Sequence, residues 1–177
     1  MSASVLVTYA SKYGSTREVA DSIAEWLSYR GVRVELSPGH EVRSLHGFDA
    51  VVLGAPLYGG SLLKEARKFL GKYRTALEKV PVALFVLGPT SATDDVDASC
   101  DELNESLAKF SWFEPVATEV FVGAYDPATL HFPDSTMVAR PTSPLFDEEA
   151  HDDRDWDAIR AWADGLPDVL GLETPGG

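Results

Sequence analysis

The sequence predicts an α/β fold: a doubly wound sheet of five parallel strands, in the order 2-1-3-4-5, with helices on both faces. Three observations support this prediction. Short apolar runs with strand character alternate along the chain with longer stretches whose apolar residues recur at helical spacing. Parallel strands need crossover connections, which place helices on both faces of a sheet. Five strands fit within the 177 residues of the chain, and we expect residues 1–177 to form a single domain.

The first half of the chain supplies three of these strands and one helix. Residues 4–10 and 48–56 are nearly continuous apolar runs, which are typical of strands buried on both faces. Residues 32–36 alternate between polar and apolar side chains and predict an edge strand. A helix is expected to begin near Ser15 and to end at Gly31, because glycine favours the position that follows a helix.

The second half continues the alternation of strands and helices. Apolar residues recur at helical spacing over residues 63–77, 96–110 and 154–166, and each of these stretches predicts a helix. Residues 80–88 form another buried run, and residues 116–124 predict the fifth strand.

A long loop or lid is expected after the fifth strand, over residues 125–154. The periodicity of the flanking elements fails here, and the stretch carries the acidic run DEEAHDD. It also contains four prolines: Pro127, Pro133, Pro141 and Pro144. A merely solvated loop is the alternative to a lid. All four histidines of the chain fall in expected loops and are expected to be exposed: His40, His46, His131 and His151.

The charge of the chain is acidic and unevenly distributed. The net charge is −13; residues 1–112 carry 12 basic and 14 acidic side chains, whereas residues 113–177 carry 3 and 14. This distribution disfavours nucleic acid and anionic membranes as partners, because both would be repelled. The acidic third is either a solvated surface or a docking face for a basic partner.

Cysteine usage and hydropathy exclude several other classes of protein. The single cysteine, Cys100, excludes an internal disulfide, and no metal-ligand spacing is present. No leader pattern precedes the first strand, and no apolar run approaches the roughly 20 residues that cross a bilayer. We therefore expect a cytoplasmic location.

Two loops are expected to carry the chemistry. In a doubly wound sheet, ligands bind beyond the carboxyl ends of the strands, where the first and third strands lie side by side. The first loop there is SKYGST, which leads into a helix. Helix N-terminal amides lack intrahelical partners and favour a phosphate, and Ser11, Ser15 and Thr16 add hydroxyl groups. As an alternative, Ser15 or Thr16 caps the helix and Glu18 completes a capping box.

The second loop is APLYGGS, after the third strand. Leu57 and Tyr58 offer an apolar and an aromatic side chain beside two glycines, which suits a flat ring. The alternative is a glycine turn next to a core tyrosine. The loop GPTSATDD, after the fourth strand, would flank the ring from the other side. Neither a G-x-x-x-x-G-K-[ST] nor a G-x-G-x-x-G motif is present, which disfavours nucleoside triphosphates and dinucleotides.

Together these segments resemble the flavodoxin-domain family. The resemblance rests on TYASKYGSTREVADSIAEWL, DAVVLGAPLYGG, the GP pair after the fourth strand and the terminal pattern DW--I--WA. Within the family, the chain is similar to the branch that includes menaquinone-dependent protoporphyrinogen oxidase. The resemblance implies a flavodoxin-like fold and flavin mononucleotide (FMN) as the cofactor.

The resemblance also implies where FMN binds. Backbone and hydroxyl groups of the first loop would hold the phosphate, and Tyr13 is included with this loop: Ser11, Lys12, Tyr13, Gly14, Ser15 and Thr16. The second loop would border the isoalloxazine ring: Pro56, Leu57, Tyr58, Gly59 and Gly60. Three residues would border its other edge: Gly88, Pro89 and Thr90. If the insert forms a lid, its candidates for ring contact are Tyr125, His131 and Phe132.

The implied function is electron transfer by a soluble FMN protein. It would act as a carrier for a redox partner protein, or as a small oxidoreductase on a quinone-like or aromatic acceptor. One alternative is a protoporphyrinogen oxidase of the flavodoxin-like type, and another is an FMN-free interaction module. The corresponding segment of the membrane-associated oxidase is basic and aromatic, whereas residues 125–154 are acidic, which disfavours membrane association. No catalytic residue and no metal site is assigned.

The predicted helix over residues 63–77 carries five basic side chains: Lys64, Arg67, Lys68, Lys72 and Arg74. A charged outer face is one interpretation. The other is a docking site for an acidic partner, or for the acidic third of a second copy in a homodimer.

Overall fold

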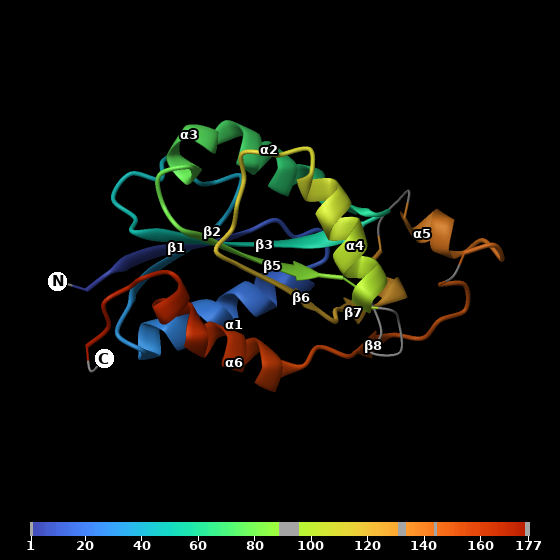
Figure 1. Ribbon diagram of the computed structural model, residues 1–177. Helices are drawn as coiled ribbons and strands as arrows, with labels where there is room; N and C mark the ends of the chain where they lie inside the picture. The colour runs from blue at the N-terminus through green and yellow to red at the C-terminus, as the bar shows by residue number, and fades with distance from the viewer. Residues whose placement is uncertain (1, 89–95, 131–133, 144, 176–177) are drawn as a thin grey trace.

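The computed structural model describes residues 2–88, 96–130, 134–143 and 145–175 (Figure 1). Its strands are β1 (Ser4–Tyr9), β2 (Arg33–Pro38), β3 (Ala50–Tyr58), β4 (Ser61–Leu62), β5 (Val82–Leu87), β6 (Ala117–Phe121), β7 (Ala124–Tyr125) and β8 (His151–Asp152). Its helices are α1 (Ser15–Tyr29), α2 (Lys64–Lys72), α3 (Arg74–Leu77), α4 (Val96–Leu107), α5 (Asp134–Val138), α6 (Trp156–Val169) and the 3₁₀ helix η1 (Pro127–Thr129).

The main sheet confirms the predicted topology. Its five long strands are parallel and run in the order β2-β1-β3-β5-β6, which corresponds to the expected 2-1-3-4-5. The strand expected at the edge, β2, lies there. One further strand, β4, pairs antiparallel with the end of β3. The three buried apolar runs of the sequence, in β1, β3 and β5, are therefore inner strands.

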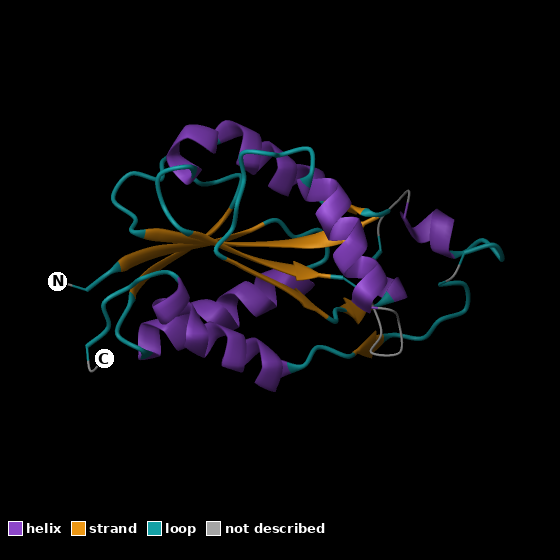
Figure 2. Ribbon diagram, in the orientation of Figure 1, coloured by secondary structure: helices purple, strands orange, loops and turns teal. Residues whose placement is uncertain are grey.

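Helices cover both faces of the sheet and bury an apolar layer on each (Figure 2). Under α1 and α6 the sheet contributes Phe85, which packs with Ile23 and Ile159. Under the helices of the opposite face it contributes Leu6 and Leu84. Successive residues of a strand point to opposite faces, so a strand with two covered faces must be apolar throughout.

The end of α1 shows why Gly31 correctly indicated where this helix stops. Gly31 has φ +85°, a conformation that residues with a Cβ rarely adopt. Its amide donates to the carbonyl of Ser28 at 3.0 Å, and the amide of Val32 donates to the carbonyl of Leu27 at 3.1 Å. These two bonds form a Schellman motif, which satisfies carbonyls that would otherwise lack partners.

The single helix predicted over residues 63–77 is wrong in one respect. It is divided into α2 and α3 at Tyr73, which leaves the helical conformation with φ −105° and ψ 15°. The hydroxyl of Tyr73 donates to the backbone carbonyl of Val42, a buried hydrogen bond to a distant loop. That tertiary anchor accompanies the break, and helical spacing alone did not predict it.

The strand predicted over residues 116–124 and the loop predicted over 125–154 are also corrected. The fifth strand of the sheet, β6, ends at Phe121. The chain then forms β7, which pairs antiparallel with β8, 26 residues further on, in a separate two-stranded sheet. The insert is therefore closed at its base, and it contains η1 and α5 between these strands.

The carboxyl ends of the parallel strands and the insert lie at the same end of the molecule. In Figure 1 the arrows of the sheet point toward α5, β7 and β8, whereas both termini lie at the opposite end. The final helix, α6, begins after Asp155, whose side chain accepts a hydrogen bond from the amide of Ala158 at 3.0 Å. Within the described residues, no helix is long and apolar enough to cross a membrane.

Candidate functional site

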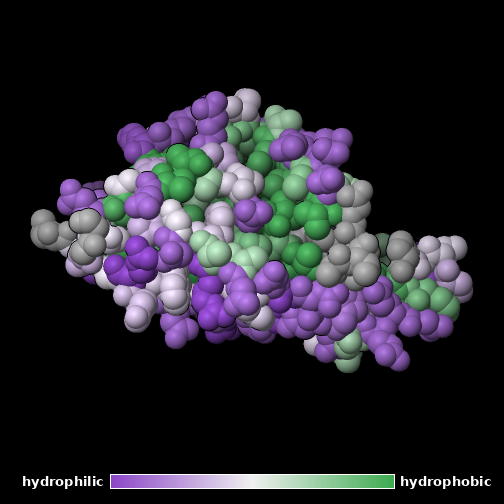
Figure 3. Space-filling view, turned by 60° about the horizontal axis from the view of Figure 1, so that its bottom comes forward, coloured by the Kyte–Doolittle hydropathy of each residue, from purple (hydrophilic) through white to green (hydrophobic). Residues whose placement is uncertain are grey.

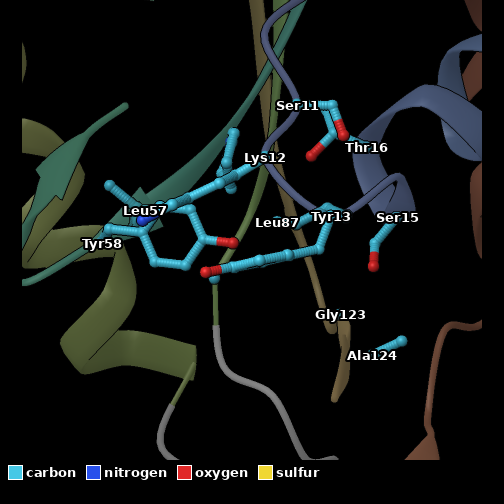
Figure 4. Close-up of a pocket in the computed structure, with 12 residues that line it drawn as sticks. Ser11, Lys12, Tyr13, Ser15, Thr16, Leu57, Tyr58, Leu87, Gly123 and Ala124 are labelled. Carbon is cyan, nitrogen blue, oxygen red and sulfur yellow. The ribbon is translucent and has the colours of Figure 1, made fainter. Parts of the chain in front are cut away.

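A pocket lies at the carboxyl ends of β1, β3 and β5 and brings the two predicted loops together (Figure 4). Its lining residues are Ser11, Lys12, Tyr13, Ser15, Thr16, Pro56, Leu57, Tyr58, Leu87, Gly88, Gly123 and Ala124. Nine of these twelve were expected as cofactor-binding residues; Leu87, Gly123 and Ala124 were missed. Of the expected residues, Pro89 and Thr90 lie outside the described part of the chain.

The loop between β1 and α1 leaves the start of the helix without a side-chain cap. Gly14 is the N-cap residue, with φ +92°, and its amide donates to Oγ of Ser11 at 2.9 Å. The alternative of a capping box is therefore wrong: Ser15 and Thr16 lie inside the helix, and Glu18 pairs with Arg154 instead. The first amides of α1 and three hydroxyl residues are thus gathered at one side of the pocket.

The loop after β3 is a tight hairpin. Gly59 and Gly60 have φ values of +56° and +75° between Tyr58 and Ser61, which are paired across β3 and β4. Positive φ at both central residues is the requirement of a two-residue hairpin turn, which explains the two glycines. Tyr58 is 42% exposed, so the alternative of a core tyrosine is wrong.

A charged residue from the insert contacts two of the residues that line this pocket. Asp134, the first residue of α5, accepts hydrogen bonds from Nζ of Lys12 and from the hydroxyl of Tyr13. Nζ of Lys12 lies 5.5 Å from the centre of the Tyr13 ring and 5.6 Å from that of Tyr58. The two tyrosine rings meet edge to face, 6.4 Å apart. Sequence inspection missed Asp134, because 122 residues separate it from Lys12.

The ionisation of this cluster follows from its contacts. The hydrogen bond to Asp134 raises the pKa of the Lys12 amine, so the amine remains charged at neutral pH. Burial raises the pKa of the Tyr58 hydroxyl, and the nearby Tyr13 and Asp134 act in the same direction. At neutral pH the cluster therefore contains one ammonium group and a Tyr58 phenol that keeps its proton.

A second contact fastens the insert to the start of α1. The side chain of Arg154 is only 7% exposed, and its Nη2 lies 2.5 Å from Asp152 and 2.9 Å from Glu18. Its Nη1 donates to the backbone carbonyl of Ser15 at 3.2 Å. Hydrogen bonds from Arg154 lower the pKa of Asp152 and hold it ionised. The residues that follow β8 are thus tied to the helix that begins at the pocket.

One expectation for the insert needs correction. His151 is not an exposed loop residue: it lies in β8, is half-buried, and its Nε2 is 3.0 Å from Oε1 of Glu148. Tyr125, a candidate for ring contact if the insert forms a lid, is buried, and its ring lies 5.8 Å from that of His151. The other two candidates for ring contact, His131 and Phe132, fall outside the described residues.

Comparison with known proteins agrees with this geometry. A family model described as "Flavodoxin domain" matches residues 6–151. A diflavin flavoprotein of Thermosynechococcus vestitus is 36% identical over 73 residues, which cover 38% of this chain and 13% of that protein. Protoporphyrinogen IX dehydrogenase [quinone] of Escherichia coli K12 is 27% identical over 82 residues, 45% of each protein. The chain thus matches less than half the length of these two curated relatives.

A solved structure of an archaeal flavodoxin gives the same fold. It superposes with a TM-score of 0.55 at 15% identity, and the match covers 95% of this chain and 99% of that one. With the fold, the pocket and the family match in agreement, the chain belongs to the flavodoxin-domain family. Membership in this family assigns FMN as the cofactor and an FMN-type redox role.

Proposed function

We propose that the chain transfers electrons through an FMN held in the pocket between residues 11–16 and the β3–β4 hairpin. One observation carries this proposal: a single pocket joins the uncapped start of α1 to an exposed tyrosine on a glycine hairpin. The first feature suits a phosphate, and the second suits the edge or face of a flat ring.

The phosphate end of the pocket fits one terminal phosphate. The helix amides carry partial positive charge, and the hydroxyls of Ser11, Ser15 and Thr16 border the same space. At Gly14 an added Cβ would meet no atom within 4 Å, so the backbone is open to a ligand on that side. Amides and hydroxyls can hold one phosphate without a group of lysines and arginines.

The ring end would be built from three strand ends. The residues that border it are Pro56, Leu57 and Tyr58, then Leu87 and Gly88, then Gly123 and Ala124. FMN, when bound, supplies the electron-transfer chemistry. The protein itself would hold the ring, exclude water with apolar side chains, and offer backbone groups of residues 57–60 to the ring nitrogens.

The acceptor is proposed to be a redox partner protein or a small quinone-like or aromatic molecule. The exposure of Tyr58 leaves the hairpin open to an approaching partner. The match to the Escherichia coli protoporphyrinogen IX dehydrogenase [quinone] favours a quinone-linked oxidoreductase as the second candidate. The net charge of residues 113–177 argues against an anionic membrane as its place of action.

The test starts with the colour of the purified chain. FMN binding is expected to give an absorbance band at about 450 nm and a saturable fluorescence titration. A chain that takes up no added FMN would refute the proposal and leave an interaction module as the function. Anaerobic turnover with NADH or NADPH and a quinone, and then with protoporphyrinogen, separates a carrier from an enzyme: a carrier shows no steady-state turnover.

A further inference from the structure

The one lysine of the first loop does not point to the phosphate end of the pocket. In Figure 4 the side chain of Lys12 extends toward Leu57 and Tyr58, away from Ser15. Its amine contacts the rings of Tyr13 and Tyr58, and it is fixed in this position by Asp134. Both charged side chains are partly buried, with 37% and 27% of the side-chain surface exposed.

Asp134 accepts hydrogen bonds from two donors in the first loop, and together they fix the position of its carboxylate. The ammonium of Lys12 and the hydroxyl of Tyr13 both donate to Oδ2. Hydrogen bonds in which one partner is ionised are roughly twice as strong as neutral ones. The insert therefore contributes a residue that contacts two lining residues of the pocket and holds the charge of Lys12 in place.

We propose that Lys12 and Asp134 form a ring-side ion pair of the FMN site. In this pair, Lys12 acts on the isoalloxazine end and not on the phosphate, and Asp134 positions it there and balances its charge. This inference rests on the proposed function, and it assigns to the insert a direct part in the cofactor site.

The pair has an electrostatic consequence that can be measured. Reduction adds electrons to the flavin, so a nearby cation stabilises the reduced form and a nearby anion destabilises it. Lys12→Met would remove the cation and lower the reduction potentials. Asp134→Asn would remove the anion and raise them. The double variant is expected to return most of the way to the potentials of the native chain.

Matched controls separate this local effect from the overall charge. Asp147→Asn removes a negative charge from an exposed position of the same insert and is the control for Asp134→Asn. Lys68→Met removes a positive charge from an exposed position of α2 and is the control for Lys12→Met. Both control variants are expected to keep the native potentials, because exposed charges are screened within about 10 Å at 0.1 M salt. Lys12→Arg retains the charge pair and is expected to keep the reduction potentials close to those of the native chain.

A second measurement separates the ring from the phosphate. FMN and riboflavin differ by the phosphate, so the ratio of their dissociation constants reports on phosphate contacts alone. Lys12→Met is expected to leave this ratio unchanged. Thr16→Val serves as the phosphate-side reference and is expected to lower the preference for FMN about tenfold.

The experiment is spectroelectrochemistry of the FMN-loaded chains together with fluorescence titrations of both flavins. Potentials that move in opposite directions in Lys12→Met and Asp134→Asn, with an unchanged affinity ratio, support the ion pair. Potentials equal to those of the controls, or a Lys12→Met variant that weakens FMN but not riboflavin, would overturn it while leaving the proposed function intact. A native chain that binds no FMN would overturn both.

Discussion

Thr16 offers a direct test of the phosphate end of the proposed site. It is 1% exposed, it lies in the first turn of α1, and it borders the pocket. Thr16→Val preserves the shape of the side chain and removes only the hydroxyl. A hydrogen bond to a charged group contributes about 1.5–3 kcal/mol, so we expect FMN affinity to fall by about tenfold or more. Fluorescence titration measures this, and riboflavin affinity should not change.

Thr8 provides the matched comparison for this prediction. It is fully buried in β1, and its Oγ1 has no hydrogen-bond partner among the described residues. An unsatisfied buried hydroxyl costs about 1–3 kcal/mol. We therefore expect Thr8→Val to increase the free energy of unfolding by about 1 kcal/mol in urea titrations and to leave FMN affinity unchanged. A loss of stability would show that the hydroxyl has a partner.

The contact between Arg154 and Asp152 predicts how stability depends on acidity. Arg154 lowers the pKa of Asp152 in the folded chain, so the ionised carboxylate favours folding. This contribution is present above the pKa of the unfolded chain, about 4, and is lost as the pH falls through the lower folded pKa. Melting temperatures between pH 5 and pH 2 should fall less steeply in Asp152→Asn than in the native chain. Equal slopes would contradict the assignment.

At the scale of elements, the β3–β4 hairpin depends on its two glycines. At Gly59 an added Cβ would meet no atom within 4 Å, so any cost of substitution comes from the positive φ and not from crowding. Gly59→Val should lower the free energy of unfolding by about 1–2 kcal/mol, because a left-handed backbone disfavours a β-branched residue. Gly59→Asn, which tolerates this conformation, is the control. Urea denaturation compares them, and similar stabilities would refute the role of the turn.

The same substitution tests the function of the hairpin. If backbone groups of residues 57–60 face the flavin, Gly59→Val should also shift its one-electron potentials. A variant that loses stability but keeps the native potentials would limit the glycines to a structural role.

At the scale of the whole molecule, acidic charge is concentrated near the end that carries the pocket. Figure 3 shows hydrophilic residues over much of the insert end beside a smaller group of hydrophobic ones, and Met137 and Phe146 of the insert are both exposed. Attraction between unlike surfaces speeds association and weakens with salt. Electron transfer to a basic haem protein should therefore slow as ionic strength rises. A neutral quinone serves as the control, and an equal response of both acceptors would exclude docking through charge.

The elements with strong local signals were predictable from the sequence. β1 and β3 are largely buried on both faces and are therefore mostly apolar, and α1 ends at a glycine that its Schellman motif requires. The parallel sheet followed from the need for crossover connections, and the strand order followed from the doubly wound fold that five such strands suit. The two loops of the pocket were found in the same way, because a doubly wound sheet brings the ends of its first and third strands together.

The remaining features depend on contacts between residues far apart in the chain, and only the tertiary structure decided them. The break at Tyr73 accompanies a hydrogen bond to Val42, and β7 is a strand because β8 pairs with it. The sequence by itself determined the fold and the two loops, since periodicity and glycine conformation are local properties, and its resemblance to the flavodoxin-domain family indicated the cofactor class. That the insert places Asp134 beside Lys12 could not be predicted, because a contact across 122 residues has no local signature.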